Sequence, residues 1–113
     1  MRNSNYIVIL ITAKDKKEAT KIARGLLEAK LIACANIMQG VESLFWWQGK
    51  IDISQEVLLV LKTKKNLFKK VTSKVKSLHS YQTPEIICLP IIDGSQGYLQ
   101  WIGDSVKPAS PIE

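Results

Sequence analysis

The chain has 113 residues, 46% of them hydrophobic, and a formal net charge of +6 at pH 7. This length fits one domain, and the apolar content is enough for a core and excludes a disordered chain. No apolar run approaches the roughly 20 residues of a membrane helix, and the N-terminal apolar stretch lacks a signal-peptide cleavage site. We therefore expect one cytoplasmic domain over residues 1–113, with a loose proline-containing tail at 107–113.

The first predicted elements are a strand and an amphipathic helix. Residues 6–12 (YIVILIT) are nearly all apolar and mostly β-branched, which favours a strand. Asp15 and Glu18 have the spacing of a capping box, in which the Asp15 side chain accepts from the Glu18 amide and Glu18 reaches back. Apolar residues at helical spacing then predict a helix over about 16–29, with a stripe of Ala19, Ile22, Ala23, Leu26 and Leu27.

Two long strands are predicted next, at 31–47 and 51–64. Gly40 indicates a bulge or bend in the first strand, and Gln48-Gly49 turns the chain between them. The centre of the second strand (VLLVL, 57–61) must be buried on both faces or lie in the middle of a sheet. A strand of about 12 residues extends roughly 40 Å, more than two helices of this size cover. The hairpin should therefore project past its own core.

The remaining elements are two helices and a strand. Asn66 can cap a helix whose apolar stripe contains Leu67, Phe68, Val71, Val75 and Leu78. Residues 85–89 (EIICL) predict a strand closed by Pro90, and residues 98–106 predict a short helix. The order βαββαβ plus a terminal helix predicts an α+β, ferredoxin-like fold, with both main helices on one face of an antiparallel sheet.

The hairpin tip carries a dense apolar group, Leu44, Phe45, Trp46 and Trp47. Such exposed patches and edges cause aggregation unless another chain covers them. We therefore predict a homo-oligomer in which hairpins pair with neighbouring strands, and a cyclic trimer is one closed solution. The alternative is a monomer whose terminal helix, with Trp101, folds over the hairpin.

The cysteines and lysines point to packing and solvation rather than to a site. Cys34 and Cys88 lie in apolar segments without a CxxC partner, so both are expected to be buried packing residues. The lysines concentrate at 14–21 and 62–76, on expected helix entrances and outer faces. These runs predict solvated surfaces, and no nucleic-acid or membrane partner is expected.

Six stretches in order resemble the CutA divalent-cation tolerance family. They are ITAKD (11–15), LIACANI (31–37), SLFWWQGK (43–50), EVLLVLKT (56–63), HSYQTPEI (79–86) and GYLQWI (97–102). The resemblance spans nearly the whole chain. It implies a ferredoxin-like fold, an interlocked homotrimer, a cytoplasmic location and a link to copper and other divalent metals.

The metal ligands implied by this resemblance are largely missing. The family has a cysteine before the threonine of its first motif and two adjacent histidines before its tyrosine motif. Those positions hold Ile11, Leu78 and His79 here, and the proline before the tyrosine is Ser80. His79 is therefore the single candidate ligand for copper or another divalent cation, and no other cofactor is expected. The alternative is that His79 caps the end of the second helix.

The resemblance also implies a cleft between subunits, lined by Trp47, Glu56, Lys62, His79 and Tyr81. Such a set of polar groups and aromatic rings could bind a small molecule, or it could be an interfacial Glu–Lys ion pair. Neither a Ser/His/Asp set nor a glycine-rich phosphate loop is visible, so no enzyme activity is expected. The leading interpretation is a homotrimeric metal-response protein; the alternative is a trimeric signalling protein that binds a small anionic ligand in this cleft.

Overall fold

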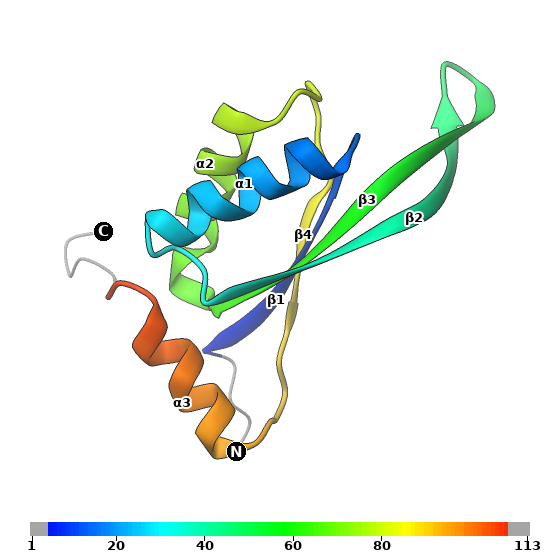
Figure 1. Ribbon diagram of the computed structural model, residues 1–113. Coiled ribbons are helices and arrows are strands. Elements are labelled where there is room, and N and C mark those ends of the chain that lie inside the picture. Colours follow the sequence, from blue (N-terminus) through cyan, green and yellow to red (C-terminus); the bar gives the residue numbers. More distant parts are fainter. Residues whose placement is uncertain (1–4, 109–113) are drawn as a thin grey trace.

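The computed structural model describes residues 5–108, which form one four-stranded antiparallel sheet with three α-helices (Figure 1). In chain order the elements are β1 (Tyr6–Ala13), α1 (Lys16–Glu28), β2 (Cys34–Trp47), β3 (Lys50–Lys64), the 3₁₀ turn η1 (Lys65–Leu67), α2 (Phe68–Leu78), β4 (Ile86–Pro90) and α3 (Gln96–Ser105). The strand order is β2-β3-β1-β4. This arrangement confirms the predicted α+β, ferredoxin-like fold. The end of the predicted tail, residues 109–113, lies outside the described residues.

Two predicted helix starts differ from the structure. Asn66 does not cap α2, because the chain leaves β3 directly into η1 and Asn66 lies within that turn. A capping residue needs the extended backbone that precedes a helix, and Asn66 has no such position here. The third helix begins at Gln96 rather than at Tyr98, with Ser95 in the extended conformation before it.

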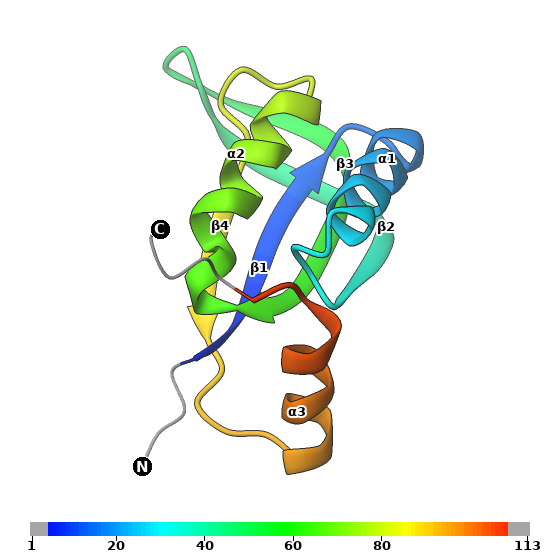
Figure 2. The same cartoon turned by 90° about the vertical axis from the view of Figure 1, so that its left-hand side faces the viewer.

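The hairpin of β2 and β3 has the predicted bulge and turn. The pairing shifts between Met38 and Val41, and Gly40 has a φ of 78°. Gln48 and Gly49 both have positive φ, as expected for the two central residues of a type I′ turn. In Figures 1 and 2 the hairpin projects beyond the helices, and α3 lies at the opposite end of the molecule. Within the described chain, α3 therefore does not cover the projecting part of the hairpin, which is the cover that the monomer alternative required.

One face of the sheet is covered by α1 and α2, which lie side by side over it (Figure 2). Alternate residues of the central strands point into this layer, and Ile9, Ile11, Leu59 and Leu61 are fully buried there. The helices contribute the stripes that their periodicity predicts, with Ile22, Leu26, Val71 and Val75 fully buried.

The other face of the sheet is not covered by α1 and α2, and α3 reaches it only at one end, where Tyr98 contacts Cys34 and Gly103 lies against Tyr6. The rest of this face is also apolar. We call it the open face; its apolar residues are Val8, Leu10, Met38, Leu58, Val60, Ile87 and Leu89. Met38, Ile87 and Leu89 are 43–50% exposed in the single chain, and the strand centres are only half-buried. The prediction for VLLVL is confirmed in its second form, because β3 lies in the middle of the sheet. Burial on both faces is not reached within one chain, since Leu58 and Val60 are only half-buried.

The two cysteines are less buried than predicted. Cys34 is half-buried at the start of β2, and Cys88 is exposed on β4. Cys88 faces the helix side but lies on the edge strand β4, where the helices give less cover. Cys34 pairs with Lys62 and faces the open side, where Tyr98 of α3 covers it in part. None of the described helices has both the length and the apolar character needed to cross a bilayer.

Candidate functional site: a polar network at the end of the sheet

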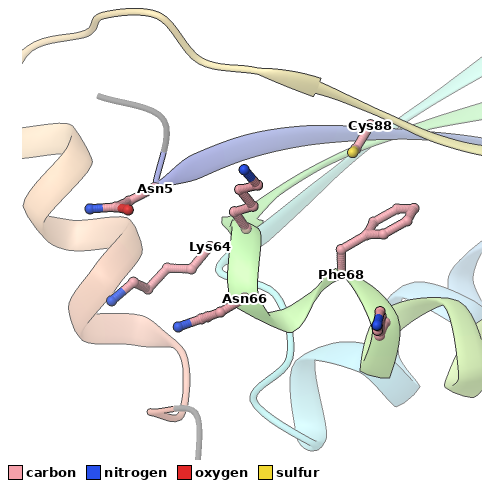
Figure 3. Close-up of a pocket in the computed structure, with 7 residues that line it drawn as sticks. Asn5, Lys64, Asn66, Phe68 and Cys88 are labelled. Atoms are coloured by element: carbon pink, nitrogen blue, oxygen red, sulfur yellow. The ribbon is translucent and has the colours of Figure 1, made fainter. Parts of the chain in front are cut away.

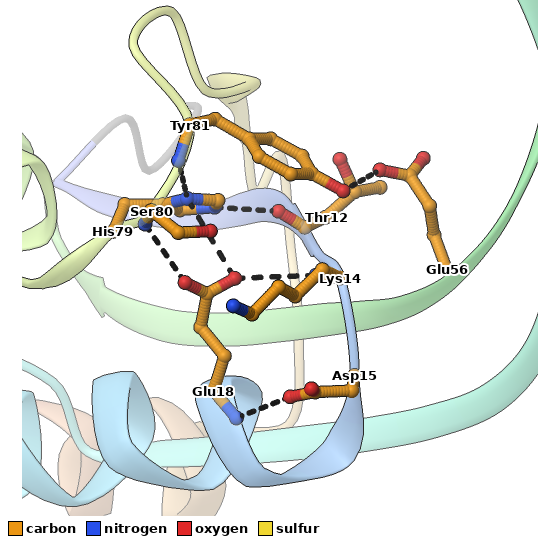
Figure 4. A network of polar contacts seen from close by, with 8 residues as sticks. All are labelled: Thr12, Lys14, Asp15, Glu18, Glu56, His79, Ser80 and Tyr81. Carbon is orange, nitrogen blue, oxygen red and sulfur yellow. Dashed lines mark hydrogen bonds and ion pairs between the residues drawn. The ribbon is translucent and has the colours of Figure 1, made fainter.

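The network begins at the junction of β1 and α1 (Figure 4). The Asp15 carboxylate accepts the backbone N–H of Glu18 at 2.8 Å, which confirms the predicted helix cap. The Glu18 carboxylate turns back and accepts the N–H of Lys14 at 3.2 Å rather than that of Asp15. The start of α1 is therefore closed by two carboxylates, as the positive end of a helix favours.

Glu18 also connects α1 to the loop that follows α2. Its second oxygen accepts the backbone N–H of Ser80 at 2.8 Å, and the side chain is 7% exposed. Burial by itself would raise the pKa of this carboxyl. Hydrogen bonds from Ser80 and from the backbone of Lys14, with the nearby His79, outweigh burial and hold the pKa below its usual value.

His79, the only histidine, lies at the C-terminal end of α2 and its side chain is fully buried. Its Nε2–H donates to the carbonyl of Thr12 at 2.7 Å. Its Nδ1 accepts the backbone N–H of Tyr81 at 3.1 Å and lies 3.8 Å from the Glu18 carboxylate. The backbone N–H of His79 also bonds to Val75 at 2.8 Å, so His79 does occupy the predicted helix C-cap position.

These contacts do not fit the metal role predicted for His79. Both ring nitrogens are used by backbone groups, which leaves no lone pair free for a metal ion. The positions of the expected co-ligands hold Ile11, fully buried in the core, and Leu78, which packs against it. Within residues 5–108 no group of three His, Cys, Asp or Glu side chains is arranged to hold a metal. His79 instead orders the loop that carries Tyr81.

Tyr81 joins this loop to the open face of the sheet. Its ring lies beside the His79 imidazole, with centroids 4.7 Å apart, and its hydroxyl donates to Glu56 on β3 at 2.7 Å. Burial, and then the hydrogen bond to the Glu56 carboxylate, raise the pKa of Tyr81 well above its usual range. Tyr81 therefore stays a neutral donor, and the pair presents one hydroxyl and a half-exposed carboxylate to whatever lies over the open face.

The five residues of the predicted cleft do not all meet within one chain. Glu56, His79 and Tyr81 are together, but Lys62 lies six residues further along β3, about 20 Å away. The Lys62 ammonium donates to Asn36 on β2. Trp47 is at the hairpin tip, 59% exposed. A cleft that contains all five would need Lys62 and Trp47 from other copies of the chain, which remains a prediction.

Four residues of the network were not predicted: the carbonyl of Thr12, the backbone N–H of Lys14, Ser80, and Glu18 in its role beyond the cap. Glu18 could have been found from the sequence, because it precedes Ile22 by four residues and so falls on the buried stripe of α1. A carboxylate at such a position requires partners. Nothing local in the sequence indicates that Ser80 provides one of them.

The comparisons with known proteins agree with this fold. The family model described as CutA1 divalent ion tolerance protein matches residues 7–105. The chain belongs to this family. A divalent cation tolerance protein (Cut A1) of Thermus thermophilus, among the solved structures, superposes with a TM-score of 0.89 at 41% identity, over 90% of this chain and 99% of that one. A CutA structure from Archaeoglobus fulgidus gives 0.88 at 43% identity, over 90% and 99%.

A further relative is a rice protein, CutA 1, chloroplastic, which is 40% identical over 101 residues. The match spans 89% of this chain but only 57% of the rice protein, so this chain corresponds to little more than half of it. The Archaeoglobus structure is named as periplasmic and the rice protein as chloroplastic. These names give no support to the cytoplasmic location expected from the sequence.

Proposed function

We propose that this protein acts in divalent-cation tolerance as a homotrimer, without catalysis of its own. The observation that supports this most is the open face, an apolar surface that continues into the exposed hairpin. Two further copies in a closed ring would remove that surface from water through head-to-tail contacts. Catalysis has little support, because both ring nitrogens of His79 are bonded to backbone and Tyr81 is held as a neutral donor.

In this proposal copper or another divalent cation is bound between copies and not by one chain. Each copy contributes the half-exposed carboxylate of Glu56, at the border of the open face. Lys62 and Trp47 of neighbouring copies complete the cleft, while His79 holds Tyr81 in place. The Glu56 carboxylate, unlike the buried His79 imidazole, keeps acceptor lone pairs available, because the hydrogen bond from Tyr81 uses only one of them.

Calorimetric titration with Cu(II) and Zn(II) tests the role of Glu56. The background should carry Cys34→Ser and Cys88→Ser, because thiolates bind these metals independently. We expect binding heat that is lost in Glu56→Gln and kept in Glu42→Gln, an equal charge change on the exposed hairpin. His79→Gln should lower thermal stability and leave the heat unchanged. Equal binding by Glu56→Gln and the parent would refute the assignment.

Acrylamide quenching of tryptophan fluorescence tests the assembly. Trp46 and Trp47 are 73% and 59% exposed in the single chain. If hairpins dock on neighbouring copies, a variant that retains these two tryptophans and carries Trp101→Phe should be poorly quenched when assembled. It should become readily quenched on dilution below the association range. Full quenching at every concentration would contradict the proposed docking.

A further inference from the structure

Apart from the polar network, the structure has a basic pocket on the helix side of the sheet, where β3 runs into α2 (Figure 3). Its volume is about 690 Å³, within the usual range for small-molecule sites. The residues that line it include Lys64, Lys65, Asn66, Phe68, Lys69 and Cys88. Three of the described lining residues are thus lysines and none is acidic. This site is separate from the Glu56–Tyr81 pair.

The start of α2 differs from the start of α1 in its electrostatics. Asp15 and Glu18 close α1. In the described structure, neither η1 nor α2 has a side-chain cap or an acidic residue in its first turn. Lysines next to the positive end of a helix are unfavourable, because like charges meet there. An anion bound among Lys64, Lys65 and Lys69 would relieve this repulsion.

The remaining lining residues narrow the chemistry of that anion. Phe68 points from the first turn of α2 toward Cys88 on β4, and its half-buried ring offers a flat apolar surface (Figure 3). Lysine ammonium groups bind phosphate as point charges, and an aromatic ring stacks on flat heterocycles. We propose that this pocket binds a small phosphate-bearing molecule with a flat ring, such as a nucleotide. This inference goes beyond the proposed cation function and does not depend on it.

Titration with ATP, inorganic pyrophosphate and adenosine tests the pocket on the full chain. We expect ATP to bind more tightly than pyrophosphate, and adenosine to bind weakest, with affinity falling as salt rises. The double variant Lys65→Gln/Lys69→Gln should weaken ATP binding by at least about tenfold, or 1.4 kcal/mol. Lys17→Gln/Lys21→Gln, the same charge change on exposed positions of α1, should weaken it by less than about threefold.

Cys88 provides an independent readout inside the pocket. ATP should slow the alkylation of Cys88 by iodoacetamide at least about fivefold, as measured by peptide mass mapping. Alkylation of Cys34, which lies outside the pocket, should be unchanged. Equal losses of affinity in the two double variants, or no protection of Cys88 at saturating ATP, would overturn the assignment. Neither result would bear on cation binding at Glu56.

Discussion

The two faces of the sheet are built from the same strands and differ in how they are covered. On the helix side, Ile9, Ile11 and Leu59 are fully excluded from water. On the open face, Leu10 and Val60 alternate with them but stay half-exposed. The chain thus contains one complete core and one apolar surface that lacks a cover. Stability of the fold should depend on the first, and assembly on the second.

The largest effect is expected from a charge on the open face. Val60→Glu would bury an unpaired carboxylate in every copy of an assembled trimer, at a cost of several kcal/mol each. The single chain leaves this position half-exposed, so the fold should survive. Light scattering should show dissociation with an unchanged circular dichroism spectrum. Ser73→Glu, on the exposed side of α2, should stay assembled. An assembled Val60→Glu variant would contradict this role of the open face.

A cavity on the helix side should act on folding and not on assembly. Leu59 is fully buried, and Leu59→Ala should lower the free energy of unfolding by about 2–5 kcal/mol. The neighbouring Leu58→Ala, on the open face, should instead weaken association, so that its trimer dissociates at a higher protein concentration than the trimer of Leu59→Ala. Sedimentation equilibrium on the folded variants distinguishes the two. Equal dissociation of the two trimers would contradict the comparison.

Removing the Glu18 charge should weaken the connection between the start of α1 and the loop that follows α2. Glu18→Gln should cost about 2 kcal/mol at pH 7, since the carboxylate accepts two backbone N–H groups. The pKa of Glu18 is lowered by folding, so its contribution is complete above the ordinary value of 4.5 and is lost as pH falls below it. Urea unfolding from pH 7 to pH 3 should therefore show the two proteins converging. A constant difference would rule out this electrostatic role.

The smallest effect is expected where the two sides meet, at the hydrogen bond of Tyr81 to Glu56. Tyr81→Phe should cost about 1 kcal/mol, because water can replace the hydroxyl at a half-exposed carboxylate. Folding raises the pKa of Tyr81, so this contribution is present below pH 10 and declines above it. Thermal unfolding should show a smaller stability difference between Tyr81→Phe and the parent at pH 11 than at pH 7. A larger difference at pH 11 would contradict this role of the hydrogen bond.

The fold was predictable because its periodic segments are clear. The bulge at Gly40, the turn at Gln48-Gly49 and the cap at Asp15 each rest on a local rule that the structure follows. The predicted cap at Asn66 was wrong, because a capping residue is recognised in a sequence by its type alone. The 3₁₀ turn that moves the start of the helix past Asn66 depends on how β3 ends. Local sequence does not specify that junction.

The site was only partly predictable, because its contacts join distant segments. His79 bonds to Thr12, 67 residues away, and Glu18 bonds to Ser80, 62 residues away. The family resemblance suggested a metal ligand at His79, whereas the backbone groups around it use both ring nitrogens. Glu56 and Tyr81 were expected together from the family resemblance, and they are 2.7 Å apart.

Sedimentation equilibrium over nanomolar to micromolar concentrations tests most directly whether copies of this chain cover the open face. We predict a particle of three times the chain mass that persists through the micromolar range, and the same mass for Leu59→Ala under conditions that keep this variant folded. A particle with the mass of one chain at every concentration, with a native circular dichroism spectrum, would contradict the account.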